Sequence, residues 1–307
     1  MKKKIILVAA AVLVLSILAA CGKAGDKKPA GGNNHAGHGA ISGQENAEKP
    51  AGNEKKEAGE MDHGGGHGGH GADAKPAAEN LQASFAFPAG AAKANEETEL
   101  TIQVKDKDGK PVNKYDVNHE KLLHLIIVNH DLSFFNHIHP EFKGDGTFTV
   151  NTSFPAGGEY KVFADFIPTG GANTTLSEWV KVEGKEGKHA AIAADANLVK
   201  EVDGKEIELS MSAAKPKEDV TLTFNIRDAK TKKGINNLQP YLGAVGHVVI
   251  LSEDANQYLH VHPIDEKATG PDAKFATSFP QSGTFKIWGQ FQHNGEVFTV
   301  PFVVNVR

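Results

Sequence analysis

Hydrophobic and polar residues alternate along most of the chain after residue 80. In the stretch TELTIQVK the apolar positions are Leu100, Ile102 and Val104, and the same period of two recurs in the later runs. Such alternation over five to eight residues predicts β-strands with one buried face. Turn signals rich in Gly, Asp and Pro, such as residues 107–111 and 144–146, separate the runs. We therefore expect antiparallel strands and no long amphipathic helix.

The same plan of strands occurs twice. The run DVTLTFNIRD at 219–228 repeats the alternation and the following turn of TELTIQVKD at 98–106. About seven strands in roughly 105 residues, with turns every 8–12 residues, are typical of an immunoglobulin-like sandwich. The predicted fold class is therefore all-β: two tandem immunoglobulin-like β-sandwiches, at 81–186 and 187–307, after a signal peptide and a disordered tether.

The first 21 residues have the pattern of a bacterial secretion signal. Three lysines precede an apolar run from Ile5 to Ala20, which is short for a membrane span. The run ends Leu-Ala-Ala before Cys21, the only cysteine, and this resembles a lipobox. Residues 1–21 are thus predicted to be a lipoprotein signal peptide and lipobox, with Cys21 lipidated. The alternative is an uncleaved helical anchor; either one places the folded part in the cell envelope, at the outer face of the cytoplasmic membrane.

Residues 22–80 are low in complexity. Ile41 and Met61 are their only large apolar side chains, so the segment cannot bury enough surface to fold and is predicted to be a disordered tether rich in His and Gly. Its imidazoles favour loose capture of Zn(II), Cu(II) or Ni(II); the alternative is a plain spacer. These weaker metal candidates are His35, His38, His63, His67 and His70.

Composition excludes several function classes. The net charge of −5 gives no basic footprint for nucleic acid. One cysteine and three methionines do not support a disulfide framework or a thioether-rich Cu(I) site. No hydrolase, P-loop or zinc-protease motif is present, so we expect no enzyme. Aspartates near the histidines described below leave a hydrolytic site open as a third alternative: Asp131, Asp165, Asp254 and Asp265.

One family resemblance covers each of the two domains. A leading strand followed by LTIQVKDKDGKPV, on a lipoprotein, resembles the YtkA-like family of bacterial secreted domains, which is related to the CopC-type copper-resistance sandwiches. The resemblance implies an immunoglobulin-like fold and a link to metal handling. CopC-type sites typically use a mature N-terminal histidine, whereas the predicted mature N-terminus here is Cys21. The resemblance therefore does not supply the ligands.

A three-histidine pattern is the sharpest chemical signal, because it occurs in both copies. Each copy has one histidine, a second 13 residues later, and the ending His-x-His-Pro. If each stretch is a β-hairpin, the first and third histidines lie opposite each other and the second shares their face, within about 5–8 Å. Three imidazoles form a reasonable shell for Zn(II) or Cu(II). The predicted ligands are His124, His137 and His139 in the first copy and His247, His260 and His262 in the second.

Weaker candidates surround these hairpins. His130 lies near the first turn, Asp165 and Gln290 occupy equivalent places in the two copies, and His293 follows Gln290 by three residues. An acid or amide there can orient an imidazole. The apolar neighbours of the histidines leave a purely structural role at the rim of a sandwich as the alternative.

The predicted function is that of a cell-surface lipoprotein that binds copper or zinc for resistance, buffering or delivery. The alternative is a non-catalytic envelope module that docks a protein partner, with structural histidines. In both cases the lipid at Cys21 attaches the chain to the membrane. Whether the two domains bind metal separately or share one site stays open at this point.

Overall fold

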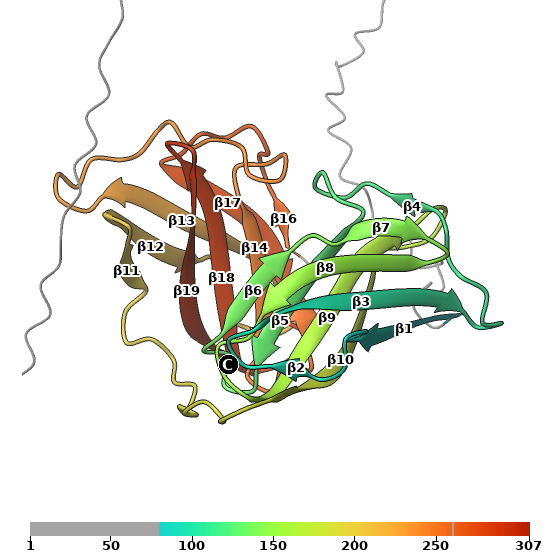
Figure 1. Cartoon of the computed structure of the whole chain (residues 1–307). Coiled ribbons are helices and arrows are strands. Elements are labelled where there is room, and N and C mark those ends of the chain that lie inside the picture. Colours follow the sequence, from blue (N-terminus) through green and yellow to red (C-terminus); the bar gives the residue numbers. More distant parts are fainter. Residues whose placement is uncertain (1–79, 260) are drawn as a thin grey trace, which may run out of the picture. The chain divides into compact units, whose positions relative to one another are not determined.

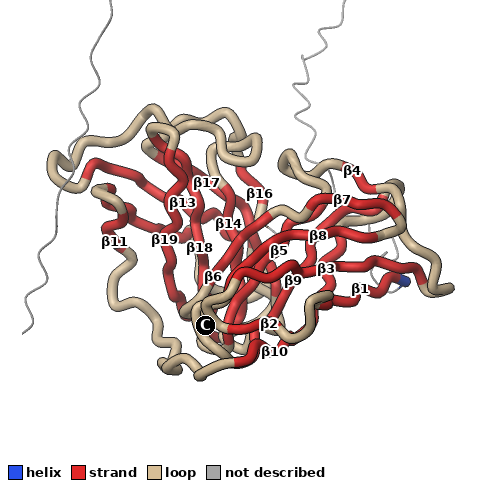
Figure 2. Tube along the Cα trace, in the orientation of Figure 1, coloured by secondary structure: helices blue, strands red, loops and turns tan. Residues whose placement is uncertain are grey.

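The computed structural model describes residues 80–259 and 261–307. These residues belong to one compact unit of the chain, 68–307. The predicted signal peptide with Cys21, the five predicted tether histidines and His260 lie outside the described residues. Within the described ranges, no helix has the length and hydropathy of a membrane span. Strands and loops account for them apart from a single helical residue, Asn80 (Figure 2).

Nineteen strands are present in the described part of the chain, and Figure 1 shows them coloured in chain order. The strands are β1 (Leu81–Ala86), β2 (Ala92–Lys93), β3 (Glu97–Asp106), β4 (Tyr115–Asp116), β5 (Leu123–Asn129), β6 (Phe135–Ile138), β7 (Glu141–Gly144), β8 (Thr147–Ser153), β9 (Gly158–Pro168), β10 (Thr174–Glu183), β11 (Val199–Val202), β12 (Lys205–Met211), β13 (Asp219–Asp228), β14 (His247–Ser252), β15 (Tyr258–Leu259), β16 (His262–Pro263), β17 (Asp272–Ser278), β18 (Gly283–His293) and β19 (Glu296–Val306).

The strands form two sandwiches of two sheets each, which confirms the predicted fold class. The first sandwich pairs the sheet β1-β3-β8-β7 with the sheet β2-β10-β9-β5-β6, and β4 adds to β9. The second pairs β11-β12-β13-β17-β16 with β15-β14-β18-β19. Each sandwich has its own core, centred on Phe148 and Phe166 in the first and on Phe224 and Phe302 in the second. The alternating runs predicted from sequence are the inner strands β3, β8 and β13.

Strand β5 is buried on both faces. Leu125 and Ile127 point into the core of the first sandwich, as the period of two requires. His124, Ile126 and Val128 lie on the opposite face, and all three are buried as well. The apolar residues beside the histidine are therefore not on a free rim, because something covers this outer face.

The second sandwich provides that cover. In β14, Val248 and Ile250 belong to its own core, while Val249 and Leu251 face outward on the side of His247. A third apolar cluster joins the two outward faces, and its exclusion from water holds the sandwiches together. Its buried members are Ile126, Val128, Leu132, Phe163, Val249, Leu251, Ala255 and Trp288.

Contacts across this interface are reciprocal. Phe135 of the first sandwich stacks on Trp288 of the second at 4.6 Å between ring centroids. Tyr258, which pairs with β14 as Phe135 pairs with β5, lies against Phe163 at 5.6 Å. Equivalent residues thus make equivalent contacts in both directions, the pattern of an isologous, two-fold interface.

Two lysines repeat the reciprocity with hydrogen bonds. Lys161 donates to Oδ1 of Asn256 at 2.9 Å, and Lys286 donates to the carbonyl of Leu132 at 2.7 Å. Each lysine lies on the central strand of one sandwich and reaches the hairpin turn of the other. These bonds satisfy charged groups that the interface takes from water.

The predicted hairpin registers are partly confirmed. Leu125 pairs with Ile138 and Ile250 with Leu259, which are the registers that place the first and third histidines opposite each other. The expectation for His262 is wrong, however. After Leu259 the chain leaves β14, and His262 pairs with Ala276 in the other sheet, where it is exposed. The segment after Leu259 passes from one sheet to the other and so gains a new pairing strand. A pattern local to one hairpin does not contain this information.

Candidate metal centre

Three histidines from the two sandwiches meet at the interface. His124 begins the outward face of β5, His137 lies on β6, and His247 begins β14. One ring nitrogen from each lies within 4.8 Å of the others. The rings of His124 and His247 stack at 5.3 Å, with 10° between their planes. The site is therefore shared between the domains.

The backbone fixes the tautomer of His124. Its Nε2 lies 2.9 Å from the carbonyl oxygen of Asn118. A carbonyl oxygen can only accept, so Nε2 carries the proton and donates it. The other nitrogen of the neutral ring, Nδ1, is left with a free lone pair.

A side chain of the second sandwich is the partner of His137. Gln290 lies 3.2 Å from Thr299 Oγ1 through its amide nitrogen and 2.6 Å from Nδ1 of His137 through its amide oxygen. The hydroxyl of Thr299 can donate as well as accept, so these contacts hold the ring of His137 in place in either orientation of the amide.

Two ring nitrogens approach each other closely. His124 Nδ1 and His137 Nε2 are 3.0 Å apart, at hydrogen-bond distance. Two nitrogens that share one tetrahedral ion at about 2.0–2.1 Å lie about 3.3 Å apart. The observed separation is thus close to that of two ligands of one ion. His247 would complete a three-nitrogen shell by moving roughly 1.5 Å or less.

Burial keeps these imidazoles neutral. It lowers the pKa of His124 to about 4, against a smaller opposing effect of the hydrogen bond to Asn118. Burial, followed by the charge of His124, lowers the pKa of His137 to about 3. Metal ions bind neutral imidazole, so both nitrogens are available as ligands at neutral pH.

His139 lies at the edge of the same cluster. Its ring centroid is 5.0 Å from that of His124 and 4.8 Å from that of His137. Its Nε2 is buried and has no hydrogen-bond partner. A buried polar atom without a partner needs an explanation, and a bound ion or water is one. Burial also lowers the pKa of His139 to about 4.

Sequence reasoning missed His119. Its ring meets that of His247 edge-on at 5.3 Å and lies 6.3 Å from that of His124. It has no counterpart in the second copy, where Leu242 takes the equivalent place before His247. A search for histidines repeated in both copies could not find it. The only signal in the sequence was that His119 lies five residues before His124.

Asp165 and Gln290 occupy equivalent places, as predicted, but have different partners. Asp165 lies opposite His124, and Gln290 lies opposite His247. Asp165 accepts a hydrogen bond from Thr175 at 3.0 Å and interacts with the hydroxyl of Tyr258. Burial raises its pKa to about 7. Its place at the interface is therefore clear, and its role as a metal ligand stays a prediction.

The remaining weaker candidates lie elsewhere. His130 stacks on Trp179 at 4.1 Å, and its Nε2 is 3.2 Å from Glu159. His293 has Asn237 as its partner at 3.2 Å. Neither belongs to the group of three, and the structure does not bring them to it.

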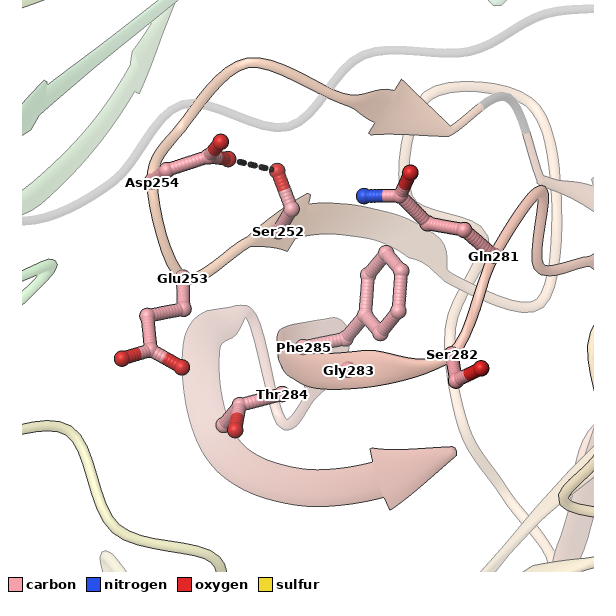
Figure 3. Close-up of a pocket in the computed structure, with 8 residues that line it drawn as sticks. All are labelled: Ser252, Glu253, Asp254, Gln281, Ser282, Gly283, Thr284 and Phe285. Atoms are coloured by element: carbon pink, nitrogen blue, oxygen red, sulfur yellow. Dashed lines mark hydrogen bonds between the residues drawn. The ribbon is translucent and has the colours of Figure 1, made fainter. Parts of the chain in front are cut away.

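Two cavities lie near these strands. One, of about 270 Å³, is formed by the turn after β14 and the start of β18. Figure 3 shows the ring of Phe285 in it and the bond from Ser252 to Asp254, and no histidine lines it. The other, of about 310 Å³, has His139 in its wall together with Glu99 and Glu141. It brings solvent to the first-sandwich side of the cluster.

The family comparison matches both sandwiches. The family described as "Domain of unknown function (DUF8832)" matches residues 78–184 and again residues 200–307. The chain belongs to this family. It carries two copies of the DUF8832 domain, in agreement with the repeat found in the sequence. The resemblance to the YtkA-like and CopC-related domains stays a prediction.

Solved structures with a similar arrangement are distant. The Escherichia coli adhesin FdeC is 18% identical, with 74% of this chain and 64% of that chain covered and a TM-score of 0.23. The Yersinia pseudotuberculosis adhesin InvE is 12% identical (74% and 60% covered, TM-score 0.23). A Salmonella α2-macroglobulin mutant is 13% identical (75% and 15% covered, TM-score 0.26).

The chain spans less than two thirds of each of these three proteins. Other similar structures include the integrin-binding protein invasin, fibronectin(III)-like modules of Clostridium thermocellum CbhA and a Parabacteroides merdae β-glucuronidase. At these identities the likeness concerns the fold class alone. No curated protein matches the chain.

Proposed function

We propose that the chain binds a transition-metal ion, Zn(II) or Cu(II), at the interface between its two sandwiches. The observation that carries the proposal is the approach of three ring nitrogens: His124 Nδ1 and His137 Nε2 are 3.0 Å apart, and one nitrogen of His247 lies within 4.8 Å of the other two residues' ligand atoms. His247 is the third ligand. Both domains thus contribute to one site.

The donor set selects the class of ion. Imidazole nitrogens suit Zn(II), Cu(II) and Ni(II), whereas Mg(II) and Ca(II) prefer oxygen. No thiolate is present in the described part of the chain, because the only cysteine is Cys21. Three imidazoles leave a fourth position for water or a carboxylate. The proposed function is binding, for resistance, buffering or delivery.

The predicted N-terminal segments place this function at the cell surface. A lipid on Cys21 would anchor the chain to the outer face of the cytoplasmic membrane, or elsewhere in the envelope. The tether would hold the sandwiches tens of ångströms from the anchor, at roughly 5–6 Å × √n for n flexible residues. Its five histidines would collect ions loosely, and the interface site would hold them.

Zn(II) titration calorimetry tests the proposal. The protein is the full chain with its five tether histidines replaced by glutamine, so that only the folded part binds tightly. We expect one tight equivalent, rather than one per hairpin. His137→Gln should lower the affinity at least 100-fold, and His130→Gln, on the exposed imidazole beside Trp179, should leave it unchanged. No uptake by the parent protein would refute metal binding.

A second candidate is a non-catalytic protein-interaction module of the cell envelope. It agrees with the names of several similar structures, which are bacterial adhesins or an integrin-binding invasin. It predicts an envelope partner whose capture by the chain is unaffected by EDTA and by His137→Gln. Loss of capture in EDTA would instead connect the partner to the metal site.

A further inference from the structure

Lys161 and Asn256 are in contact across the interface between the sandwiches. Nζ of Lys161, on β9, donates to Oδ1 of Asn256, in the hairpin turn of the second sandwich, at 2.9 Å. Because a carbonyl bond is about 1.23 Å long, Nζ lies within about 4.1 Å of the amide carbon Cγ. Reacting atoms in a productive geometry lie about 3–3.5 Å apart, so a rotation of the amide brings the amine to attacking distance.

A carboxylate holds the same amide from its other end. Nδ2 of Asn256 donates to Oδ2 of Asp254 at 2.9 Å, which assigns the amide nitrogen to this side and the amide oxygen to Lys161. The other oxygen of Asp254 accepts from Ser252 at 2.5 Å (Figure 3) and from the backbone N–H of Asn256 at 3.0 Å. The bond from Ser252, followed by that from the backbone, lowers the pKa of Asp254, so the carboxylate can accept a proton at neutral pH.

The surroundings of Lys161 favour the neutral amine, which is the reactive form. The residue is only 8% exposed and lies beside the buried ring of Phe163. Burial lowers the pKa of Lys161, and the charge of Asp254 opposes this effect. A lysine that is taken out of water in this way becomes a nucleophile. Asn256 and Asp254 are exposed, so a small product can leave to the solvent.

The reciprocal contact of the interface lacks the amide. Lys286, the equivalent lysine, donates to a backbone carbonyl of the first hairpin turn at 2.7 Å. Ser133 occupies the place of Asn256 in this turn. Its backbone N–H donates to Asp131 at 3.0 Å, as that of Asn256 donates to Asp254. The turn thus forms without an asparagine, and a serine side chain has no carbonyl carbon that an amine could attack.

We propose that Lys161 and Asn256 form an isopeptide bond that joins the two sandwiches covalently. Nζ attacks Cγ, the Nζ–Cγ bond forms, and the Cγ–Nδ2 bond breaks. Asp254 accepts the proton that Nζ loses and returns it to Nδ2, which leaves as ammonia. One amide replaces another, so no oxidant, reductant or water is consumed. The cross-link is independent of the proposed metal binding.

Tryptic peptide mapping of the full chain by mass spectrometry tests the bond. Trypsin does not cleave after a lysine whose Nζ is part of an amide, so the expected product is residues 144–181 joined to residues 234–267. Its mass should be that of the two peptides less one ammonia, and fragmentation should place the cross-link at Lys161 and Asn256. The bond should form in EDTA, so its failure is distinct from failure of the metal site. Separate peptides 144–161 and 234–267 in the parent protein would overturn the proposal.

Matched variants separate the reaction from the contact. Lys161→Arg keeps a donor to Asn256 but removes the nucleophile, so it should give no cross-linked product. Asp254→Asn should lower the cross-linked fraction at least about tenfold. Lys286→Arg, at the equivalent lysine, should leave it unchanged. Cooperative urea unfolding of each variant verifies that a missing cross-link does not come from a missing fold. A cross-link in Lys161→Arg, or full yield in Asp254→Asn, would overturn the assigned roles.

Discussion

The side-chain amide of Gln290, on the second sandwich, lies 2.6 Å from Nδ1 of His137, on the first. The contact holds the imidazole in place, so the chemistry of one domain depends on the docking of the other. Thr299 orients the amide in turn, at 3.2 Å. A ligand, its orienting partner and a further support thus form a chain across the interface.

Gln290→Leu should therefore weaken Zn(II) binding without touching a ligand. Loss of such an orienting bond typically costs 10–100-fold in metal affinity. Titration calorimetry on the full chain, with tether histidines replaced by glutamine, measures it. Thr299→Val leaves the amide in place and should cost less. Equal affinity in Gln290→Leu and the parent would show that metal binding does not need Gln290 to hold the ring of His137.

The metal-free protein should lose stability as the pH falls from about 6.5 to about 3. The unfolded imidazoles have a pKa near 6.5, and the folded values are about 4 for His124 and His139 and about 3 for His137. Within this window the unfolded chain binds more protons, so the free energy of unfolding rises with pH. At about 1.4 kcal/mol per pKa difference of one, the loss is several kcal/mol.

Urea unfolding in EDTA between pH 3 and pH 8 measures this loss. His139→Asn should remove part of the slope. A free energy of unfolding that is flat between pH 4 and pH 6.5 would contradict the burial of neutral histidines.

Asp165→Asn should stabilise the protein at alkaline pH. Burial raises the pKa of Asp165 to about 7. A carboxyl whose folded pKa is raised contributes stability at pH values below its unfolded pKa, and that contribution is lost as the pH rises through 7. Asparagine carries no such charge and can still accept from Thr175. We expect a gain of roughly 1–3 kcal/mol at pH 8 that shrinks toward pH 5. Lower stability of the variant at pH 8 would argue that the charged form is favoured.

Trp288→Ala should open the interface. The indole is 3% exposed and stacks on Phe135, and truncating a buried aromatic residue typically costs 3–5 kcal/mol. Urea unfolding measures the loss, and Zn(II) affinity should fall with it, because His247 is on the same face. Val297→Ala, at a side chain 45% exposed, should change stability by less than about 0.5 kcal/mol. A fall in stability with unchanged metal affinity would show that metal binding does not depend on the packing of the two sandwiches against each other.

Local patterns were enough for the strands and for the hairpin registers. The period of two located β3 and β13, and the pairings of Leu125 with Ile138 and of Ile250 with Leu259 follow from the spacing of the histidines. The path beyond Leu259 could not be predicted, because proximity to the other sheet decides where His262 pairs. Hairpin geometry has no information about that sheet.

The shared site was hidden for a related reason. Ile126 and Val249 are apolar on the outward faces of their strands, and this signal is readable in the sequence. The apolar pattern indicates that this face of each strand is covered, but it does not identify the part of the chain that covers it. His119 was missed because the equivalent position of the second copy holds Leu242. Repetition in both copies was the reason for selecting the other histidines as candidate ligands, and His119 is not repeated.

The reciprocal interface places the two halves as the subunits of a symmetric homodimer would be placed. Joining them in one chain makes their encounter intramolecular, at an effective concentration in the millimolar range for a short flexible connection. A site assembled from both halves then survives dilution, which a dimer of separate copies at low abundance would not. The linkage also frees each half to diverge alone. Gln290 can be a hydrogen-bond partner of an imidazole while Asp165, at the equivalent position, is a partner of Tyr258. A dimer of identical chains would have the same residue at both positions.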